Sequence, residues 1–116
     1  LVRRTCSQCR EEVEVGDDSL TDLGLKREEL NGRKFYRGRG CELCNNTGYK
    51  GRIGLFELMI LNDEIRDMVM ANASIDMLRE ASKGYGMVPL RDAGMNFMFD
   101  GTTTPDEVIR ETIVEA

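Results

Sequence analysis

Histidine is absent from this sequence of 116 residues. The chain therefore cannot supply a histidine general base, a histidine-containing catalytic triad or a mixed cysteine–histidine zinc site. No G-x-x-x-x-G-K-[ST] phosphate loop occurs, and the glycines at 38–40 and 84–86 are explained by turns. The acidic pairs Asp17/Asp18 and Asp63/Glu64 stand at expected helix starts, where the helix dipole favours carboxylates. We therefore expect that the chain is not an enzyme on its own.

Long apolar runs are also missing. The longest, Leu58-Met59-Ile60-Leu61, is far shorter than the roughly 20 residues that span a bilayer. The chain opens Leu1-Val2-Arg3-Arg4-Thr5, with no apolar region behind the arginines, which does not fit a secretory signal. We expect a soluble intracellular protein. Because the sequence starts without Met and reads as ordered from the outset, we also expect it to be a piece of a longer chain.

Cysteine is scarce, but its four copies form two pairs with the same internal spacing, Cys6-Ser7-Gln8-Cys9 and Cys41-Glu42-Leu43-Cys44. A two-residue gap lets one tight turn direct both thiolates at a common point. Two such turns supply the four thiolates of a structural zinc site, which leaves no open position for chemistry. The sequence thus predicts Zn²⁺ bound by Cys6, Cys9, Cys41 and Cys44.

Other uses of the cysteines stay open at this point. Two disulfides are disfavoured, because nothing in the sequence indicates an oxidising compartment. Iron in a rubredoxin-like site also uses four thiolates. Redox chemistry and unligated thiols complete the alternatives.

Charge and hydrophobic content suggest how the chain is divided. With 41% hydrophobic residues it can bury one modest core, or two small lobes of which one depends on a metal. A structural zinc contributes roughly 10–16 kcal/mol of apparent binding free energy to folding. The net charge is −5, yet the cysteine-bearing stretches 1–10 and 33–52 are basic and the remainder is acidic. Basic zinc lobes often contact phosphate, but a solvated positive face is the favoured interpretation here.

Short elements are expected around the cysteines. The alternation in Arg10–Val15 favours a strand. Gly16–Ser19 favours a turn with a helix start, and Leu20 and Leu23 favour one or two helical turns closed by Gly24. A second helical piece at Lys26–Leu30 ends at the turn dipeptide Asn31-Gly32. We expect two further strands, and glycines that let the backbone curl around sulfur; these are Lys34–Arg37, Lys50–Met59, Gly38 and Gly40.

Beyond Leu61 the pattern changes to helices. Asn62 and Ser74 are candidate caps, Pro89 suits a first turn, and Thr104-Pro105-Asp106-Glu107 is a capping box. Gly84 and Gly101 are expected to stop the second and third helices. The predicted inward faces are Ile65, Met68 and Val69; Ile75, Leu78 and Ala81; Leu90, Ala93, Phe97 and Met98; and Val108, Ile109 and Ile113. The Met residues are interpreted as core filling rather than as a flexible peptide-binding groove.

The predicted fold class is α+β. A small four-cysteine zinc-binding lobe with short strands (residues 1–61) is followed by a C-terminal helical subdomain (residues 62–116), a bundle of about four short helices.

Two stretches resemble a known family. Residues 1–9 and 40–58 look like the tetracysteine domain of the ATPases that drive type II secretion and type IV pilus extension. The likeness continues at Gly86-Met87, Leu90, Asp92 and Gly94, and from Gly101-Thr102-Thr103 through Glu107-Val108 and Arg110. It covers essentially the whole chain and is weakest over residues 16–34.

The resemblance implies a structural zinc at Cys6, Cys9, Cys41 and Cys44. It places the phosphate loop, the magnesium-binding acidic motifs and the histidine motif upstream, so ATP and Mg²⁺ belong only to the parent protein. It also implies a homo-hexameric parent in the cytoplasm, peripheral to the bacterial inner membrane, that engages a platform membrane protein. No nucleic acid partner is expected.

We therefore predict a C-terminal zinc-binding module of a secretion or type IV pilus assembly ATPase, with a structural and coupling role. One alternative is a stand-alone zinc-binding module for nucleic acid or protein interaction, and another is an iron electron carrier. The acidic remainder of the chain disfavours nucleic acid. That alternative would use Arg3, Arg4, Arg33, Lys34, Arg37, Arg39, Lys50 and Arg52, with Phe35, Tyr36 and Tyr49 for stacking.

Overall fold

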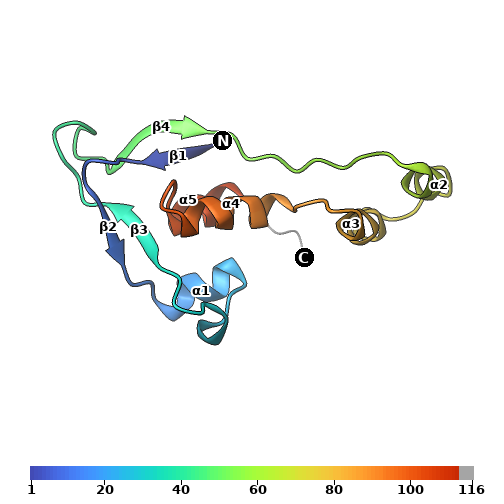
Figure 1. Ribbon diagram of the computed structural model, residues 1–116, viewed down its shortest axis with the longest axis horizontal. Helices are drawn as coiled ribbons and strands as arrows, with labels where there is room; N and C mark the ends of the chain where they lie inside the picture. Colours follow the sequence, from blue (N-terminus) through green and yellow to red (C-terminus); the bar gives the residue numbers. More distant parts are fainter. Residues whose placement is uncertain (113–116) are drawn as a thin grey trace.

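The computed structural model describes residues 1–112, which form two small sheets and five α-helices. The elements are β1 (Val2–Thr5), β2 (Arg10–Val13), α1 (Asp17–Leu23), a 3₁₀ turn η1 (Arg27–Glu29), β3 (Phe35–Gly38), β4 (Tyr49–Ile53), α2 (Asp63–Met70), α3 (Ile75–Gly84), α4 (Leu90–Phe99) and α5 (Pro105–Glu111). The molecule measures 54 × 30 × 21 Å, with the strands at one end and α2 and α3 at the other (Figure 1). The predicted α+β class is confirmed.

Each sheet is a single antiparallel ladder. β1 pairs with β4 from Val2↔Ile53 to Thr5↔Tyr49, and β2 pairs with β3 from Arg10↔Gly38 to Val13↔Phe35. All four cysteines lie just beyond the ends of these ladders, so antiparallel pairing brings the two Cys-x-x-Cys turns together. The ladders are therefore what positions the cysteine site.

The strand predictions are correct for β2 and β3 and need a correction further along. A strand was expected over Lys50–Met59, but β4 covers Tyr49–Ile53. Its partner β1 has only four residues, so the ladder ends at Val2↔Ile53. Beyond Gly54 the chain is drawn out without regular structure as it runs to α2 (Figure 1).

The predicted helix starts are confirmed by their caps. The side chains of Asn62, Ser74 and Thr104 accept hydrogen bonds from backbone N–H groups at the starts of α2, α3 and α5. Pro89 immediately precedes α4, and Pro105 is the first residue of α5. Gly84 is the last residue of α3 rather than the residue beyond it. The predicted inward residue Ile113 lies outside the described residues.

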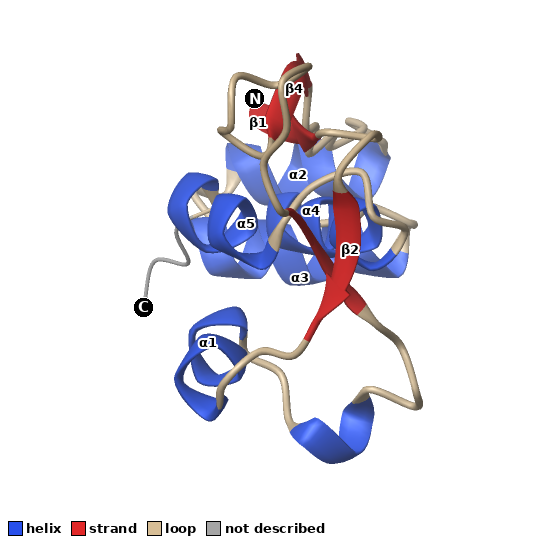
Figure 2. Cartoon of the chain, turned by 90° about the vertical axis from the view of Figure 1, so that its left-hand side faces the viewer, coloured by secondary structure: helices blue, strands red, loops and turns tan. Residues whose placement is uncertain are grey.

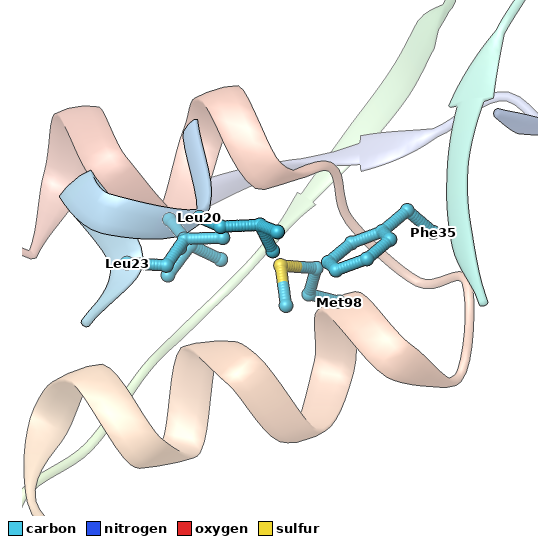
Figure 3. Packing of buried hydrophobic residues seen from close by; sticks show 5 residues of the cluster. Leu20, Leu23, Phe35 and Met98 are labelled. Atoms are coloured by element: carbon cyan, nitrogen blue, oxygen red, sulfur yellow. The ribbon is translucent and has the colours of Figure 1, made fainter. Parts of the chain in front are cut away.

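The main apolar core joins the segment between the cysteine pairs to the last two helices. Leu20 and Leu23 from α1 and Phe35 from β3 lie around Met98 of α4 (Figure 3), and Val108 of α5 completes the buried cluster. α5 accordingly lies between β1 and α1 (Figure 2). The predicted boundary between residues 61 and 62 separates segments that share this packing, and it stays a prediction.

α2 and α3 pack against each other at the far end and carry much exposed apolar surface. The core-filling interpretation of methionine holds for Met98, which is fully buried, but Met70 and Met77 are exposed. Among residues 1–112, no helix is long and apolar enough to cross a membrane.

Candidate metal centre

The four cysteines converge on one point. Their Sγ atoms all lie within 4.8 Å of one another. Cys6, Cys9 and Cys44 are buried, Cys41 is partly buried, and none of the four is in a disulfide. The structure thus brings together every residue that the sequence analysis selected as a metal ligand.

Backbone hydrogen bonds join the two cysteine turns. The Cys6 N–H donates to the Gly48 carbonyl (2.9 Å), and the Arg39 N–H donates to the Cys9 carbonyl (3.0 Å). In the second turn, the Asn46 N–H donates to the Cys41 carbonyl (2.8 Å), while Asn45 and Asn46 have φ of 56° and 61°. Asparagine tolerates this left-handed conformation better than most residues.

Glycine is required where the two turns touch. A Cβ on Gly38 would lie 2.2 Å from the Gly48 carbonyl oxygen, so the two backbones leave no room for a side chain. Gly38 was expected to curl around sulfur, but it contacts backbone instead. Gly40 fits the expectation, because its φ is 104° and its N–H donates to Cys9 Sγ. The role of Gly48 was missed, although its place in an Asn-Asn-Thr-Gly turn suggested an unusual backbone.

The sulfurs receive backbone N–H donors. The Gly40 N–H donates to Cys9 Sγ, and those of Cys41 and Gly48 donate to Cys44 Sγ, each at 3.3 Å. Burial raises the pKa of Cys9 to about 11. Burial also raises the pKa of Cys44, but its two N–H donors and neighbouring thiols outweigh this and lower it to about 6. The backbone donors therefore favour a thiolate at Cys44.

The sulfur geometry fits a metal ion. The Cys6–Cys41, Cys9–Cys44 and Cys41–Cys44 Sγ pairs are 3.7, 3.8 and 3.7 Å apart. A tetrahedral zinc with Zn–S bonds of about 2.3 Å requires S···S separations of about 3.8 Å. The cluster can hold a four-coordinate ion with little rearrangement, and four thiolates suit both zinc and iron.

Comparison with known proteins matches almost the whole chain to one family. Residues 1–110 match the family described as "Type II/IV secretion system protein". The chain belongs to this family. The predicted resemblance is thereby confirmed over almost the full length.

Several members of the type II/IV secretion family are close relatives. The chain is 42% identical over 113 residues to the type IV pilus assembly ATPase PilB of Thermus thermophilus, covering 97% of this chain and 13% of that protein. It is 37% identical to the type II secretion system protein HxcR of Pseudomonas aeruginosa, and 32% identical to the type II secretion system protein E of Dickeya dadantii. Each of these two matches covers 97% of this chain, and they cover 20% and 22% of the relatives. The chain thus spans about a fifth or less of these relatives.

In this member of the secretion family, a charged clamp ties the strand next to Cys6 to helix α5. Glu107 accepts hydrogen bonds from the Arg3 backbone N–H (2.9 Å), Nε (3.0 Å) and Nη2 (2.7 Å). The Glu107 side chain is only 3% exposed, whereas that of Arg3 is 42% exposed. The Arg3 guanidinium also stacks over Tyr49 of β4, with Cζ 3.9 Å from the ring centroid.

The clamp changes the role that the sequence analysis gave to Glu107. Thr104 caps α5 as expected, but the Glu107 carboxylate binds Arg3 instead of closing the capping box. Burial raises the pKa of Glu107, yet the hydrogen bonds from Arg3 outweigh burial and hold it below its ordinary value. No local sequence signal pairs residues 3 and 107, so the clamp was missed.

The loop before α5 adds hydrogen bonds to the same strands. The Thr103 hydroxyl donates to the Arg3 carbonyl (2.8 Å), and the Thr5 N–H donates to the Thr102 carbonyl (2.8 Å). The Tyr49 hydroxyl lies 2.8 Å from Thr104 Oγ1. Thr5 directly precedes Cys6, so its hydrogen bond to Thr102 connects the cysteine site to the loop that leads into α5.

Proposed function

We propose that this chain is the zinc-binding C-terminal module of an ATPase that drives type II secretion or type IV pilus assembly. The family match over residues 1–110, together with the four converging sulfurs, carries this proposal. Its relatives include proteins named as pilus assembly ATPases. ATP hydrolysis, with Mg²⁺, is assigned to residues of the parent protein outside this chain.

Zinc is the proposed ion, with Cys6, Cys9, Cys41 and Cys44 as its four ligands. Four thiolates close the coordination sphere, so the ion has a structural role and leaves no position for substrate. The backbone donors to Cys9 and Cys44 stabilise negative charge on sulfur. These donors support thiolate ligands rather than neutral thiols.

The proposed role of the module is to couple motion. Zinc fixes the two cysteine turns, the turns fix β1 and β4, and the Arg3–Glu107 clamp joins these strands to α5. A displacement at either end of this path is transmitted as a rigid-body movement, because each contact is short and the Glu107 carboxylate is buried. The module would act as a stiff lever on the motor.

The proposed setting follows from the family. The parent is proposed to be a homo-hexamer in the cytoplasm at the bacterial inner membrane, where it engages a platform membrane protein. This setting is supported by relatives named for secretion and pilus assembly.

The test uses the full-length parent protein, purified without added metal. We expect one zinc per chain by elemental analysis, no visible absorbance, and magnesium-dependent ATP hydrolysis. Cys41→Ser should lose the zinc, whereas Glu42→Gln, an exposed change in the same turn, should keep it. Iron in place of zinc would contradict the metal assignment, and a parent without ATP hydrolysis would contradict the proposed motor.

A further inference from the structure

The segment of residues 55–61 connects β4 to α2, and its main chain is almost without hydrogen-bond partners. It is drawn out along the top of the molecule (Figure 1). Among the described residues, its one backbone hydrogen bond is that of the Ile60 carbonyl, which accepts from the Asn62 N–H. The other main-chain donors and acceptors of the 55–61 segment have no protein partner within residues 1–112. Such a row of free groups is what an unpaired strand presents.

Side chains of the 55–61 segment alternate between two sides. Phe56, Leu58 and Ile60 line a groove of about 250 Å³ together with Tyr85 and Val88. Glu57 and Met59 line a second groove, on the side of α3, with Ile75, Leu78 and Arg79. A period of two is the side-chain pattern of a β-strand.

Both sides of the 55–61 segment are apolar, with Glu57 as the exception. Phe56, Leu58 and Ile60 are 79%, 72% and 71% exposed. Glu57 is paired with Arg79 of α3, at 3.8 Å between oxygen and nitrogen. Strands that are apolar on both sides belong to sheets covered on both faces, usually by helices. One helix, α3, already lies beside the 55–61 segment. Within residues 1–112, no strand pairs with this segment.

The relatives are long enough to supply such a sheet. The chain covers only 13% of the Thermus thermophilus PilB and 22% of the Dickeya dadantii protein. Most of such a polypeptide lies outside the residues described, and ATP hydrolysis has been assigned to it above. The edge strand of any sheet presents unpaired N–H and C=O groups, which is what the main chain of residues 55–61 requires as a partner.

We propose that residues 55–61 form a β-strand that adds to the edge of a sheet in the remaining part of the same polypeptide. Main-chain hydrogen bonds provide the attachment, and the side chains of Phe56, Leu58 and Ile60 fill the apolar face of that sheet. This inference rests on the proposed function, because it requires the larger parent protein. It also gives the predicted strand over Lys50–Met59 its missing partner.

Hydrogen exchange of the full-length parent, followed by mass spectrometry, tests the strand. We expect amides of residues 55–61 to exchange at least about 100-fold more slowly than those of an unstructured peptide, as in an ordinary strand. Protection must persist at dilutions where light scattering finds a monomer. Exchange as fast as in an unstructured peptide would overturn the proposal. Protection that is lost on dilution would also overturn it, and would assign the strand to a second copy.

Paired variants identify the face that is covered. Leu58→Glu in the full-length protein should speed exchange across residues 55–61 at least about tenfold, because it puts a charge against the sheet. Leu43→Glu, a change at an apolar residue exposed in the second cysteine turn, should leave that exchange unchanged. Equal exchange in both variants would contradict the buried face. A parent that hydrolyses ATP but leaves residues 55–61 unprotected would refute the strand and keep the proposed function. A parent in which residues 55–61 are protected but ATP is not hydrolysed would keep the strand and refute the proposed function.

Discussion

The two ends of this molecule are held together by different means. At the strand end, a buried core, four converging cysteines and a charged clamp lie within a small volume. At the other end, α2 and α3 contact mainly each other, and large apolar side chains such as Met70 and Ile75 face outward. The first end contains its own sources of stability, whereas the second exposes apolar surface of the kind that interaction sites carry.

The largest expected difference between the ends concerns the metal. Removing the proposed zinc with a chelator, or the Cys41→Ser change, should unfold all four strands, because structural zinc contributes roughly 10–16 kcal/mol to such lobes. The helical pair of α2 and α3 lies at the opposite end of the molecule from the strands (Figure 1) and should keep its secondary structure. Circular dichroism should show much of the helical signal remaining. An unchanged spectrum after verified metal removal would contradict this.

The next largest difference concerns methionine in the two regions. Met98→Ala should lower the free energy of unfolding by about 2–5 kcal/mol, since it opens a cavity among Leu20, Leu23 and Phe35. Met77→Ala on α3 removes a side chain that is 57% exposed and should change stability by less than about 0.5 kcal/mol. Urea unfolding of the zinc-loaded protein measures both. Similar losses in the two variants would mean that the ends are equally well packed.

The clamp should give a smaller, pH-dependent effect. Glu107→Gln weakens three hydrogen bonds from Arg3 and should cost about 1–3 kcal/mol at neutral pH. Glu111→Gln, on the more exposed side of α5, is the matched control and should cost little.

The pH dependence follows from the lowered pKa of Glu107. A carboxylate whose folded pKa lies below its unfolded value of about 4.3 stabilises the protein above that value. The stability gap between wild type and Glu107→Gln should therefore be constant near neutral pH. It should shrink only as the pH falls below about 4.3, through the folded pKa. A gap that shrank near neutral pH would contradict the clamp.

Glycine substitutions should give the smallest effects, with opposite signs in the two regions. Gly84 ends α3 with open space around it, so Gly84→Ala should stabilise the protein by about 0.5–1 kcal/mol. A Cβ on Gly94 of α4 would lie 3.3 Å from Leu55 and Val108, so Gly94→Ala should destabilise it by about 1 kcal/mol. Thermal unfolding of the two variants gives the signs directly, and stabilisation by both would contradict the tight packing at Gly94.

The features that could be predicted from sequence are those set by local chemistry. The two Cys-x-x-Cys turns and the caps at Asn62, Ser74 and Thr104 need only neighbouring residues, and all are found in the structure. The Arg3–Glu107 clamp joins distant residues and leaves no periodic pattern, so it was not foreseen.

The prediction of a strand over Lys50–Met59 was wrong beyond Ile53 for a different reason. Its alternation favours a β conformation, but a strand also needs a partner, and β1 ends the pairing at Ile53. Local preference alone does not produce a ladder at residues 55–61, and the partner we propose for them lies in the larger parent protein.

Adding zinc back to the metal-free protein tests the central claim most directly. Hydrogen exchange would follow the amides of β1, β4 and α5 as zinc is added. We predict that protection of all three rises together and is complete at one equivalent of zinc per chain, because the cysteine site and the clamp form one unit. Protection of these elements that is already complete without zinc would contradict the account.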